Sequence, residues 1–426
     1  MLGLAAVTLG VLCVLVLIGM PVVVSLVASV LMFLAFSGGW TMALPQQVLA
    51  GVGDYLLITL PLFILAGGIM NVTGIADKLF DFGAALVGWM RGGLAHVNVA
   101  ASLMFGGMIG TSVADLAGTG SVLIPKMKSS GYPGPFAAAV TATSSGIGVL
   151  IPPSSPMILY SVVTGTSLGA LFLAGVVPGL LMAAVMMITI AILARRNGWQ
   201  PMNSFEWSRV MQTGVHAILP LGMPAMILGG LIFGIFTATE AGSFAVAYAL
   251  ALAGLVYRTL TFAKLRKALV DSVILTGEVL MVVGFSTALG WALSQAGVPA
   301  ALALGVEGLF PFDSVTMRIL ALLLLALVAG MVLDPLIPMI MPVLLPALVA
   351  MDVDLVHFGV LIVITVVIGQ VTPPVAIALL VAAKIGGDDI WAVTRANMPF
   401  LCALFVALIL LTLFPALSTT LPGLLH

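Results

Sequence analysis

Charged side chains are scarce in this sequence, and their scarcity excludes several classes of protein. Asp, Glu, Lys and Arg together make up only 7% of the 426 residues, and the formal net charge at pH 7 is -1. A soluble globular domain carries about 25% charged residues. The 14 basic residues are also too few and too scattered to follow a phosphate backbone, which excludes nucleic acid as a partner.

Patterns typical of metal, disulfide and nucleotide sites are also missing. The two cysteines, Cys13 and Cys402, lie in apolar runs, with neither zinc-site spacing nor the density of a disulfide framework. The four histidines are isolated from one another, and no Gly-x-x-x-x-Gly-Lys-Ser/Thr loop occurs. The sequence therefore predicts no metalloenzyme, no ATP site of the usual kind and no cofactor.

Apolar residues dominate instead. They form 62% of the chain, and the mean hydropathy is +1.30. Residues 1–36 are too long and too apolar for a cleaved signal peptide and lack its basic start, so they are expected to remain as two membrane helices. The composition predicts an all-α polytopic membrane protein embedded in a lipid bilayer.

Two polar, Gly/Pro-rich interruptions stand out in this apolar background. The first runs from Gly110-Thr-Ser-Val-Ala-Asp115 to Gly148-Val-Leu-Ile-Pro-Pro153, and the second from Gly330-Met-Val-Leu-Asp334 to Gly369-Gln-Val-Thr-Pro-Pro374. Asp115 precedes Gly148 by 33 positions, and Asp334 precedes Gly369 by 35. Interrupted segments at matching places in two halves are the best sequence indicator of a transporter binding site.

We therefore divide the chain into two inverted-topology repeats, residues 1–200 and 201–426, separated by the charged segment 195–211. In the first repeat we expect an interfacial arm helix at 76–90, a re-entrant hairpin at 94–127 and a broken helix at 135–163, unwound between Ser144 and Pro153. The second repeat has an arm at 299–312, a hairpin at 318–350 and a broken helix at 357–383. Residues 94–166 and 318–384 would form a transport core, and the remainder a scaffold.

The basic residues predict the orientation of this layout. All but Arg318 fall on one side, which the positive-inside rule assigns to the cytoplasm, so that both termini face the opposite side. The residues on the cytoplasmic side are Lys78, Arg91, Lys126, Lys128, Arg195, Arg196, Arg209, Arg258, Lys264, Arg266, Lys267, Lys384 and Arg395.

Where a helix unwinds, carbonyl and hydroxyl oxygens are available to a hard cation, and Na+ is the candidate. The helix N-termini at the same breaks favour a carboxylate substrate. A first Na+ site is predicted at Gly110, Thr111, Ser112, Ser145, Gly148 and Pro152. A second is predicted at Gly330, Asp334, Gly369, Thr372 and Val375, and the substrate region at Ser144, Ser154, Thr372 and Pro373.

Several of these residues have a second interpretation. Asp115 and Asp334 are either ion ligands or N-caps that hold the hairpins in shape. Ser144 is either a substrate contact or a core residue, and Pro152-Pro153 and Pro373-Pro374 are either part of the sites or only helix stops. Thr237 and Glu240 have the spacing of a capping box, which gives Glu240 a structural role.

At these residues the chain resembles the large membrane subunit of tripartite ATP-independent periplasmic (TRAP) transporters. The resemblance covers almost the full length and includes Leu60-Pro-Leu-Phe-Ile-Leu-Ala-Gly67, Arg91-Gly-Gly-Leu-Ala-His-Val-Asn98, Ile151-Pro-Pro-Ser154 and Thr372-Pro-Pro374. Gly146 and Val149 depart from the family, which commonly has Thr and Pro at these positions.

The resemblance implies an elevator-type carrier of the bacterial inner membrane, with periplasmic termini and a Na+ gradient as its energy source. It also implies two partners: a small four-helix membrane subunit, expected as a separate chain, and a periplasmic substrate-binding protein. The substrate would be a small organic acid such as a C4-dicarboxylate or sialic acid.

Two other functions are compatible with parts of the sequence. One is a stand-alone Na+-coupled anion carrier of the same inverted-repeat type. The other is an intramembrane aspartyl protease, because Gly51-Val-Gly-Asp54 matches the Gly-x-Gly-Asp motif of that class. Such a protease needs a second Asp at similar depth to share a proton, and no Tyr-Asp partner occurs in the sequence.

Overall fold

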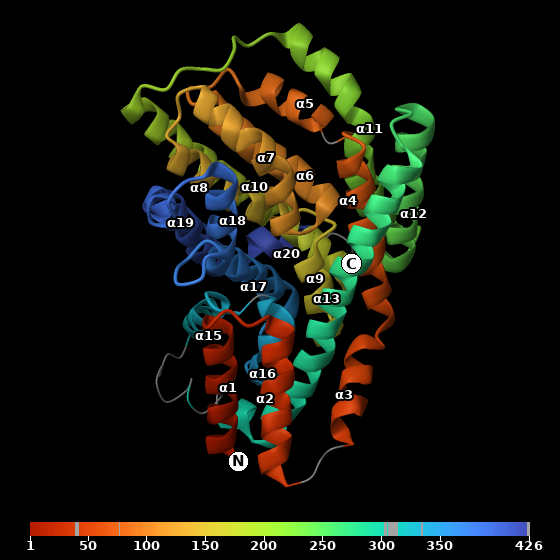
Figure 1. Ribbon diagram of the computed structural model, residues 1–426, viewed down its shortest axis with the longest axis vertical. Coiled ribbons are helices and arrows are strands. Elements are labelled where there is room, and N and C mark those ends of the chain that lie inside the picture. Colours follow the sequence, from red (N-terminus) through yellow and green to blue (C-terminus); the bar gives the residue numbers. More distant parts are fainter. Residues whose placement is uncertain (39–41, 76, 302–304, 306–313, 334, 424–426) are drawn as a thin grey trace.

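The computed structural model describes residues 1–38, 42–75, 77–301, 305, 314–333 and 335–423, and within these residues the chain is all helical (Figure 1). Six helices in the described part are long and apolar enough to cross a membrane: Tyr55–Val72, Leu168–Asn197, Trp207–Ile232, Ala238–Val256, Phe262–Gln295 and Ile390–Leu413. Several shorter apolar helices accompany them, so the prediction of an all-α polytopic membrane protein is confirmed.

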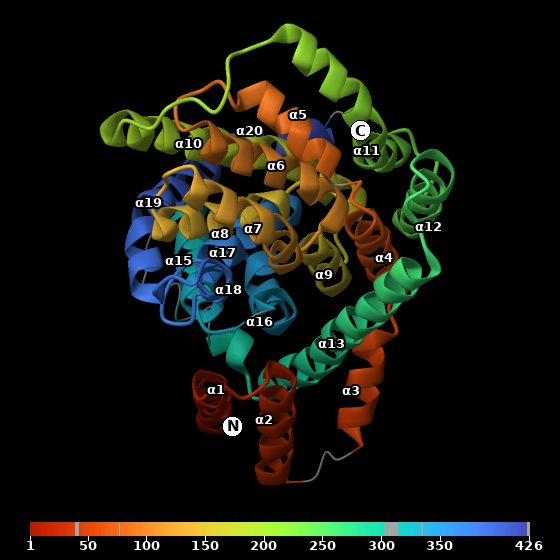
Figure 2. The ribbon, with the colours of Figure 1, turned by 45° about the horizontal axis from the view of Figure 1, so that its top comes forward.

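One group of helices is connected by a continuous series of helix–helix contacts. Its members are α1 (Leu2–Leu17), α2 (Val22–Ser37), α3 (Ala43–Val52), the 3-10 turn η1 (Tyr55–Ile58), α4 (Thr59–Val72), α11 (Trp207–Ile232), α12 (Ala238–Ala251), the π-helical turn η2 (Leu252–Val256) and α13 (Phe262–Gln295). Helix α13 packs against α2, α3 and α4, and α4 also packs against α12 (Figure 2). We call this group the scaffold.

The interrupted segments, which are the predicted core, form the other group together with the helices that follow them, which the prediction assigned to the scaffold. In the first half these are α6 (Gly93–Ile109), α7 (Ser112–Ser129), α8 (Gly134–Gly148), α9 (Ser155–Thr164) and α10 (Leu168–Asn197), preceded by the short helix α5 (Asp77–Val87). In the second half they are α15 (Val315–Gly330), α16 (Leu336–Ala350), α17 (Leu355–Gln370), α18 (Ile377–Gly386) and α19 (Ile390–Leu413), followed by α20 (Ala416–Gly423). Both halves thus show a helix pair, a broken helix and a long apolar helix in the same order.

The broken helices unwind later than their sequence suggests. Helix α8 continues through Ser144 to Gly148, and the non-helical connection begins at Val149. The hydroxyl groups of Ser144 and Ser145 donate to the carbonyls of Thr141 and Ala142, at 3.1 and 2.8 Å, so these serines follow the helix instead of interrupting it. The predicted start of the break at Ser144 is therefore wrong.

Other boundaries also differ from expectation. The segment 37–54, which has the polar composition of a loop, contains helix α3. The second arm at 299–312 lies almost entirely outside the described residues. The capping box at Thr237 and Glu240 is confirmed, since each residue's side chain bonds the other's backbone nitrogen.

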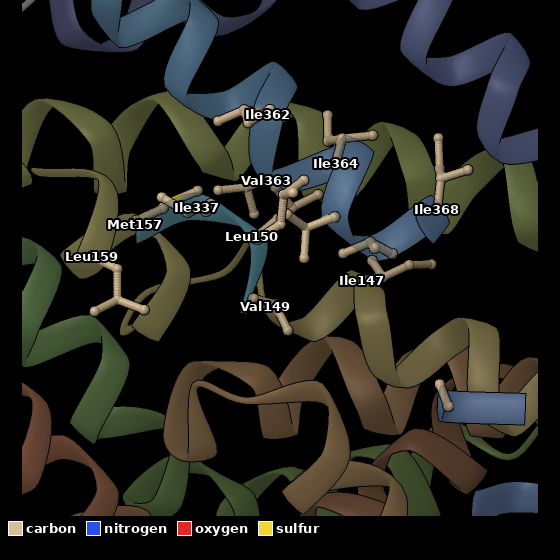
Figure 3. Packing of buried hydrophobic residues seen from close by; sticks show 14 of the residues in the cluster. Ile147, Val149, Leu150, Met157, Leu159, Ile337, Ile362, Val363, Ile364 and Ile368 are labelled. Carbon is tan, nitrogen blue, oxygen red and sulfur yellow. The ribbon is translucent and has the colours of Figure 1, made fainter. Parts of the chain in front are cut away.

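Apolar side chains from the two halves form a common core. Val149 and Leu150, in the first break, lie among Ile337 of α16 and Ile362, Val363 and Ile364 of α17 (Figure 3). Burying a side chain of this size contributes about 1.5–3 kcal/mol. The breaks are therefore held by packing between the halves as well as by their own backbone.

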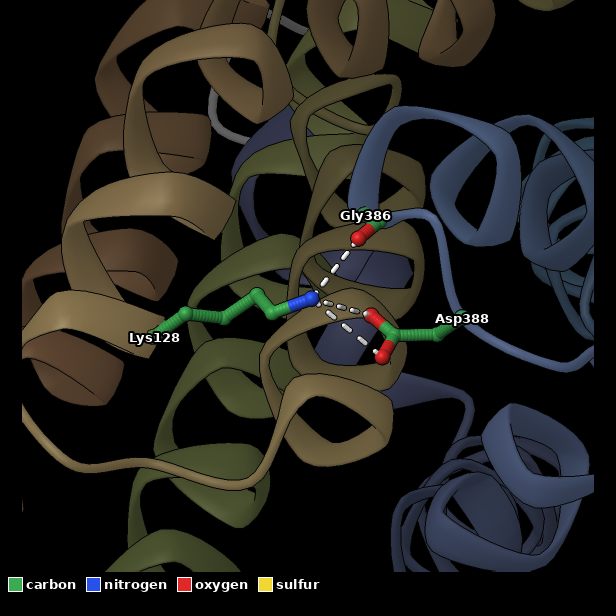
Figure 4. Close-up of polar contacts among 3 residues, drawn as sticks. All are labelled: Lys128, Gly386 and Asp388. Carbon is green, nitrogen blue, oxygen red and sulfur yellow. Dashed lines mark hydrogen bonds and ion pairs between the residues drawn. The ribbon is translucent and has the colours of Figure 1, made fainter.

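A polar contact joins the two halves near the surface. The Lys128 ammonium group, at the end of α7, donates to the Gly386 carbonyl at 2.7 Å and lies 3.4 Å from the Asp388 carboxylate (Figure 4). Helices α7 and α8 of the first half both pack against α18 of the second. The interrupted segments of both halves thus make one interlocked body.

Candidate functional site

The first hairpin turns at Gly110 and Thr111 and docks onto the first broken helix there. Gly110 adopts φ 71°, a conformation that glycine tolerates best, and Thr111 is extended. The Gly110 carbonyl accepts the Ser155 amide at 3.1 Å, and a Cβ at Gly110 would lie 2.8 Å from the Pro153 carbonyl oxygen. Gly110 and the Pro152-Pro153 connection, which are 42 positions apart, therefore meet as the sequence predicts.

The tip of the first hairpin also contacts the second broken helix. The Ser112 hydroxyl, in the first turn of α7, donates to the Gln370 side-chain oxygen at 2.6 Å. Gln370 is the last residue of α17, immediately before the second break. Ser112 belongs to the predicted first site and Gly369 to the second, so the two sites lie against each other.

Paired glycines bring the helix backbones together beside both breaks. A Cβ at Gly106 would lie 2.1 Å from the Gly148 carbonyl oxygen, and a Cβ at Gly369 would lie 2.9 Å from that of Gly330. Contacts below 3.0 Å are not tolerated, so only glycine allows either approach. The predicted site residues Gly148, Gly330 and Gly369 therefore act as backbone-contact positions in the structure.

The second break lies between α17 and α18. Thr372 is buried, and its hydroxyl donates to the Ile368 carbonyl at 2.5 Å. Pro373 and Val375 are half-buried, and Ala376 enters α18 with φ 48°, which is uncommon for a residue with a side chain. Asp334 lies outside the described residues, so its part in the second site stays a prediction.

The predicted serines of the first half all have partners. Ser144 is fully buried, and its one hydroxyl hydrogen is shared between the Asn98 side-chain oxygen at 2.9 Å and the Thr141 carbonyl at 3.1 Å. Ser154 is also fully buried, and its hydroxyl caps α9 by accepting the Met157 amide at 3.4 Å. Each hydroxyl oxygen keeps a lone pair that a ligand could use. The hydrogen bonds seen in the structure give Ser144 and Ser154 structural roles.

The packing around Gly146 explains why this chain lacks the threonine that is common in the family at this position. A Cβ at Gly146 would lie 2.4 Å from the Val367 side chain of α17. A threonine at this position would need α8 and α17 to move apart. The second half therefore occupies the space that the hydroxyl of a threonine would fill.

A buried polar network that the sequence analysis missed supports the first hairpin. The Asn98 amide of α6 donates to the Thr141 hydroxyl at 2.6 Å, and the Ser102 hydroxyl lies 3.3 Å from that of Ser144. All four side chains have no exposed surface. Asn98 is the last residue of the Arg91–Asn98 motif. An uncharged amide within an apolar helix was the feature of the sequence that could have indicated this buried network.

A second missed contact connects α8 to the second break through α19. The Thr143 hydroxyl of α8 donates to the Asn397 side-chain oxygen at 2.5 Å, and the Asn397 amide donates to the Val371 carbonyl at 3.2 Å. Asn397 lies in α19 and is buried. It satisfies a carbonyl that the end of α17 leaves without a helical partner.

Asp115 does not cap the first hairpin. The N-cap of α7 is Thr111, and Asp115 follows in the first turn. Its side chain is 1% exposed, and neither carboxyl oxygen makes a hydrogen bond of ordinary geometry within the described residues, although the Ser102 and Thr119 side chains are polar neighbours. The capping alternative is thus wrong for Asp115, and its role as an ion ligand stays a prediction.

A cleft separates the first hairpin tip from the scaffold. It has a volume of about 190 Å³ and is lined by Thr111 and Ala117 of the hairpin, by Asn71 of α4 and by Asp271 and Ser272 of α13. The space thus lies where the predicted core and scaffold face each other. It brings polar groups from both bodies to the hairpin tip.

Asp54 has a local structural role. It is the N-cap of η1, and its carboxylate accepts the Leu56 amide at 2.8 Å. No group of three or more His, Cys, Asp or Glu side chains that could hold a metal occurs in the described part of the chain. The contact with the Leu56 amide gives Asp54 a helix-capping role.

Comparison with known proteins places the chain in a family. Residues 9–417 match the family model of the Tripartite ATP-independent periplasmic transporter, DctM component. The chain is 37% identical over 410 residues to the sialic acid TRAP transporter large permease protein SiaM of Vibrio cholerae, which covers 95% of both chains. It is 35% identical to the C4-dicarboxylate TRAP transporter large permease protein DctM of Pseudomonas aeruginosa, which covers 93% of both.

A third relative agrees with this assignment, and a solved structure shares the fold. The chain is 32% identical to the 2,3-diketo-L-gulonate TRAP transporter large permease protein YiaN of Escherichia coli, over 87% of this chain and 88% of that one. The crystal structure of the Alcanivorax borkumensis YdaH transporter matches with a TM-score of 0.59 and 14% identity, over 89% and 90% of the two chains, and shows a shared fold. The protein is a transport protein and not an enzyme, and it belongs to the DctM-component family of large TRAP transporter permeases.

Proposed function

We propose that this protein carries a small carboxylate across the bacterial inner membrane by Na+-coupled symport. The observation that carries the proposal is the meeting of the first hairpin tip with the second break, through the 2.6 Å contact between Ser112 and Gln370. Gly110 and Ser112 lie at the turn between α6 and α7, and Thr372 follows Gln370 by two positions in the second break. Carbonyl and hydroxyl oxygens of this kind are ligands that hard cations prefer.

The names of the relatives suggest the substrate class and the partners. These relatives are named for sialic acid, C4-dicarboxylates and 2,3-diketo-L-gulonate, which are all organic acids. We infer that this chain also takes an organic acid, delivered by a periplasmic binding protein, and works with a small membrane subunit. The helix N-termini at the two breaks favour a carboxylate.

The direct test is uptake into proteoliposomes that contain this chain with its small subunit and binding protein. Labelled sialic acid, succinate and diketogulonate should be supplied with an inward Na+ gradient, without ATP. We expect uptake of one organic acid that stops when K+ replaces Na+. Uptake that is unaffected by this replacement would refute Na+ coupling, and full uptake by the chain alone would favour a stand-alone carrier.

We further propose an elevator mechanism, in which the core formed by the interrupted segments moves against the scaffold. Inverted repeats are supported by the matching helix order in the two halves and by the two hairpins, α6–α7 and α15–α16, which lie in opposite parts of the molecule (Figure 1). Contacts such as Lys128 with Asp388 join the halves within the core, so these elements would move together.

Cross-linking distinguishes core motion from a rigid protein. A Cβ at Gly118 of α7 would lie 3.5 Å from the side chain of Asn71 of α4, across the boundary between core and scaffold. In a background without Cys13 and Cys402, we expect a short thiol cross-link in Asn71→Cys/Gly118→Cys to abolish uptake. The matched pair Lys128→Cys/Asp388→Cys joins α7 of the core to the residue pair directly after α18, which packs against α7, and its cross-link should leave most uptake intact. Equal uptake in both cross-linked pairs would contradict the elevator.

Thr372→Ala should weaken Na+ dependence more than folding. The hydroxyl donates to the Ile368 carbonyl, so a lone pair remains free for a cation. Losing one buried polar partner costs about 1–3 kcal/mol, which is roughly a five- to 150-fold rise in the Na+ needed for half-maximal uptake. The measurement is this concentration beside the melting temperature, with Thr372→Ser as control. The matching first-half residue is Ile151, so the two sites should not be equivalent.

A further inference from the structure

A second and larger cleft lies away from the breaks. Its volume is about 580 Å³, and its lining residues are Trp89, Met90, Arg91, His96, Ala191, Arg195 and Pro201. These come from the turn between α5 and α6, from the first turns of α6, from the end of α10 and from the connection after α10. The transport proposal uses none of them.

The cleft carries positive charge without a compensating group. Its lining contains two arginines and no carboxylate. Within the described part of the chain, neither guanidinium group takes part in an ion pair or a side-chain hydrogen bond. Arg91 and Arg195 come from different elements but face the same space. An anion between them would relieve their mutual repulsion and join the α5–α6 turn to α10.

A buried histidine is among the lining residues of this cleft. His96 has no exposed surface, and neither ring nitrogen makes a hydrogen bond of ordinary geometry in the described residues, although the Arg91 backbone lies beside the ring. Unpaired buried polar groups are costly, and a bound oxyanion would accept a hydrogen bond from the imidazole. His96, Arg91 and Arg195 line one space, and guanidinium and imidazole N–H donors suit a phosphate group.

The surroundings of the cleft indicate where the phosphate comes from. Trp89 is 45% exposed and lies edge-on to Phe205, with ring centroids 5.7 Å apart, and Phe205 lies 6.3 Å from Trp207. Exposed aromatic rings next to basic side chains are typical of the membrane interface. The cleft also lies at the end of α10, a helix long enough to span the bilayer.

We propose that this cleft binds the phosphate headgroup of an anionic phospholipid, held by Arg91, His96 and Arg195. The aromatic cluster Trp89, Phe205 and Trp207 would lie at the level of the headgroups, and the phosphate would bridge the arm helix to α10. Each arginine near a lipid surface contributes about five-fold to affinity for an anionic headgroup.

The test is the thermal stability of the full-length purified chain in detergent, titrated with phosphatidylglycerol, phosphatidylcholine or inorganic phosphate. We expect phosphatidylglycerol alone to raise the melting temperature. The half-saturating lipid concentration should rise about five-fold in Arg91→Gln or Arg195→Gln, and about 25-fold in the double variant. Arg196→Gln removes the neighbouring exposed charge of α10 outside the cleft and should behave as the wild type.

Three results would overturn the proposal. The first is an equal phosphatidylglycerol effect in the wild type and the Arg91→Gln/Arg195→Gln variant. The second is an equal effect of inorganic phosphate, which would assign the cleft to a free anion. The third is that phosphatidylglycerol no longer raises the melting temperature when the small membrane subunit is bound. That result would mean that the small subunit, and not a lipid, covers the cleft. The Arg91→Lys/Arg195→Lys variant keeps both charges and should retain part of the lipid effect, which separates charge loss from misfolding.

Discussion

Replacing Gly106 by alanine is expected to abolish transport and to lower the melting temperature by several degrees. The added methyl group would lie 2.1 Å from the Gly148 carbonyl oxygen and 2.2 Å from the Gly148 Cα, and both are backbone atoms that cannot rotate away. Helices α6 and α8 would have to separate. Overpacking of this kind costs about 1–3 kcal/mol and occasionally more. The Gly110 turn and the first break would then lose their contact.

Two other glycines provide the matched controls. Gly277→Ala places a methyl group where α13 has no neighbour within 4 Å, so it should leave uptake unchanged and raise stability by about 0.5–1 kcal/mol through the higher helix propensity of alanine. Gly369→Ala meets Gly330 at 2.9 Å and should act like Gly106→Ala but more weakly. A Gly106→Ala variant with wild-type uptake and melting temperature would show that the breaks do not need this backbone approach.

Asp115→Asn is expected to raise the Na+ concentration for half-maximal uptake roughly ten- to 150-fold, which corresponds to loss of a charged polar contact of about 1.5–3 kcal/mol. The carboxyl group is buried in the first turn of α7, four positions after Thr111, and lacks a hydrogen bond of ordinary geometry in the described residues. A buried carboxylate needs a compensating charge, and a Na+ ion at the hairpin tip would provide it.

The stability of the same variant separates a ligand from a structural residue. Without Na+, Asp115→Asn should melt at the same temperature as the wild type or higher, because the amide avoids the cost of burying a charge. Added Na+ should stabilise the wild type by mass action and have little effect on Asp115→Asn. A variant that melts lower in the absence of Na+ but keeps the wild-type Na+ response would show that Asp115 only supports the fold.

The sequence by itself determined the class of the protein and the position of its interruptions. A chain with 7% charged residues and apolar runs of this length has to satisfy its backbone in helices, so an all-α membrane protein follows from composition. The helix breaks near Pro152-Pro153 and Pro373-Pro374 can be predicted from the sequence because proline has no amide hydrogen to continue a helix. The family follows from the motifs around the same positions.

Only the tertiary structure decided which of these groups meet. Ser112 and Gln370 are 258 positions apart, and no local pattern predicts their contact. A serine in a helix can bond its own backbone, and it can also bond a distant partner if a neighbouring helix brings one within reach. Ser144 bonds both the Thr141 carbonyl of its own helix and Asn98 of α6, and only the packing of α6 on α8 determines the second contact. Burial likewise depends on packing between the halves: Asp115 and Asp54 are both aspartates near a helix start, yet only Asp54 caps its helix.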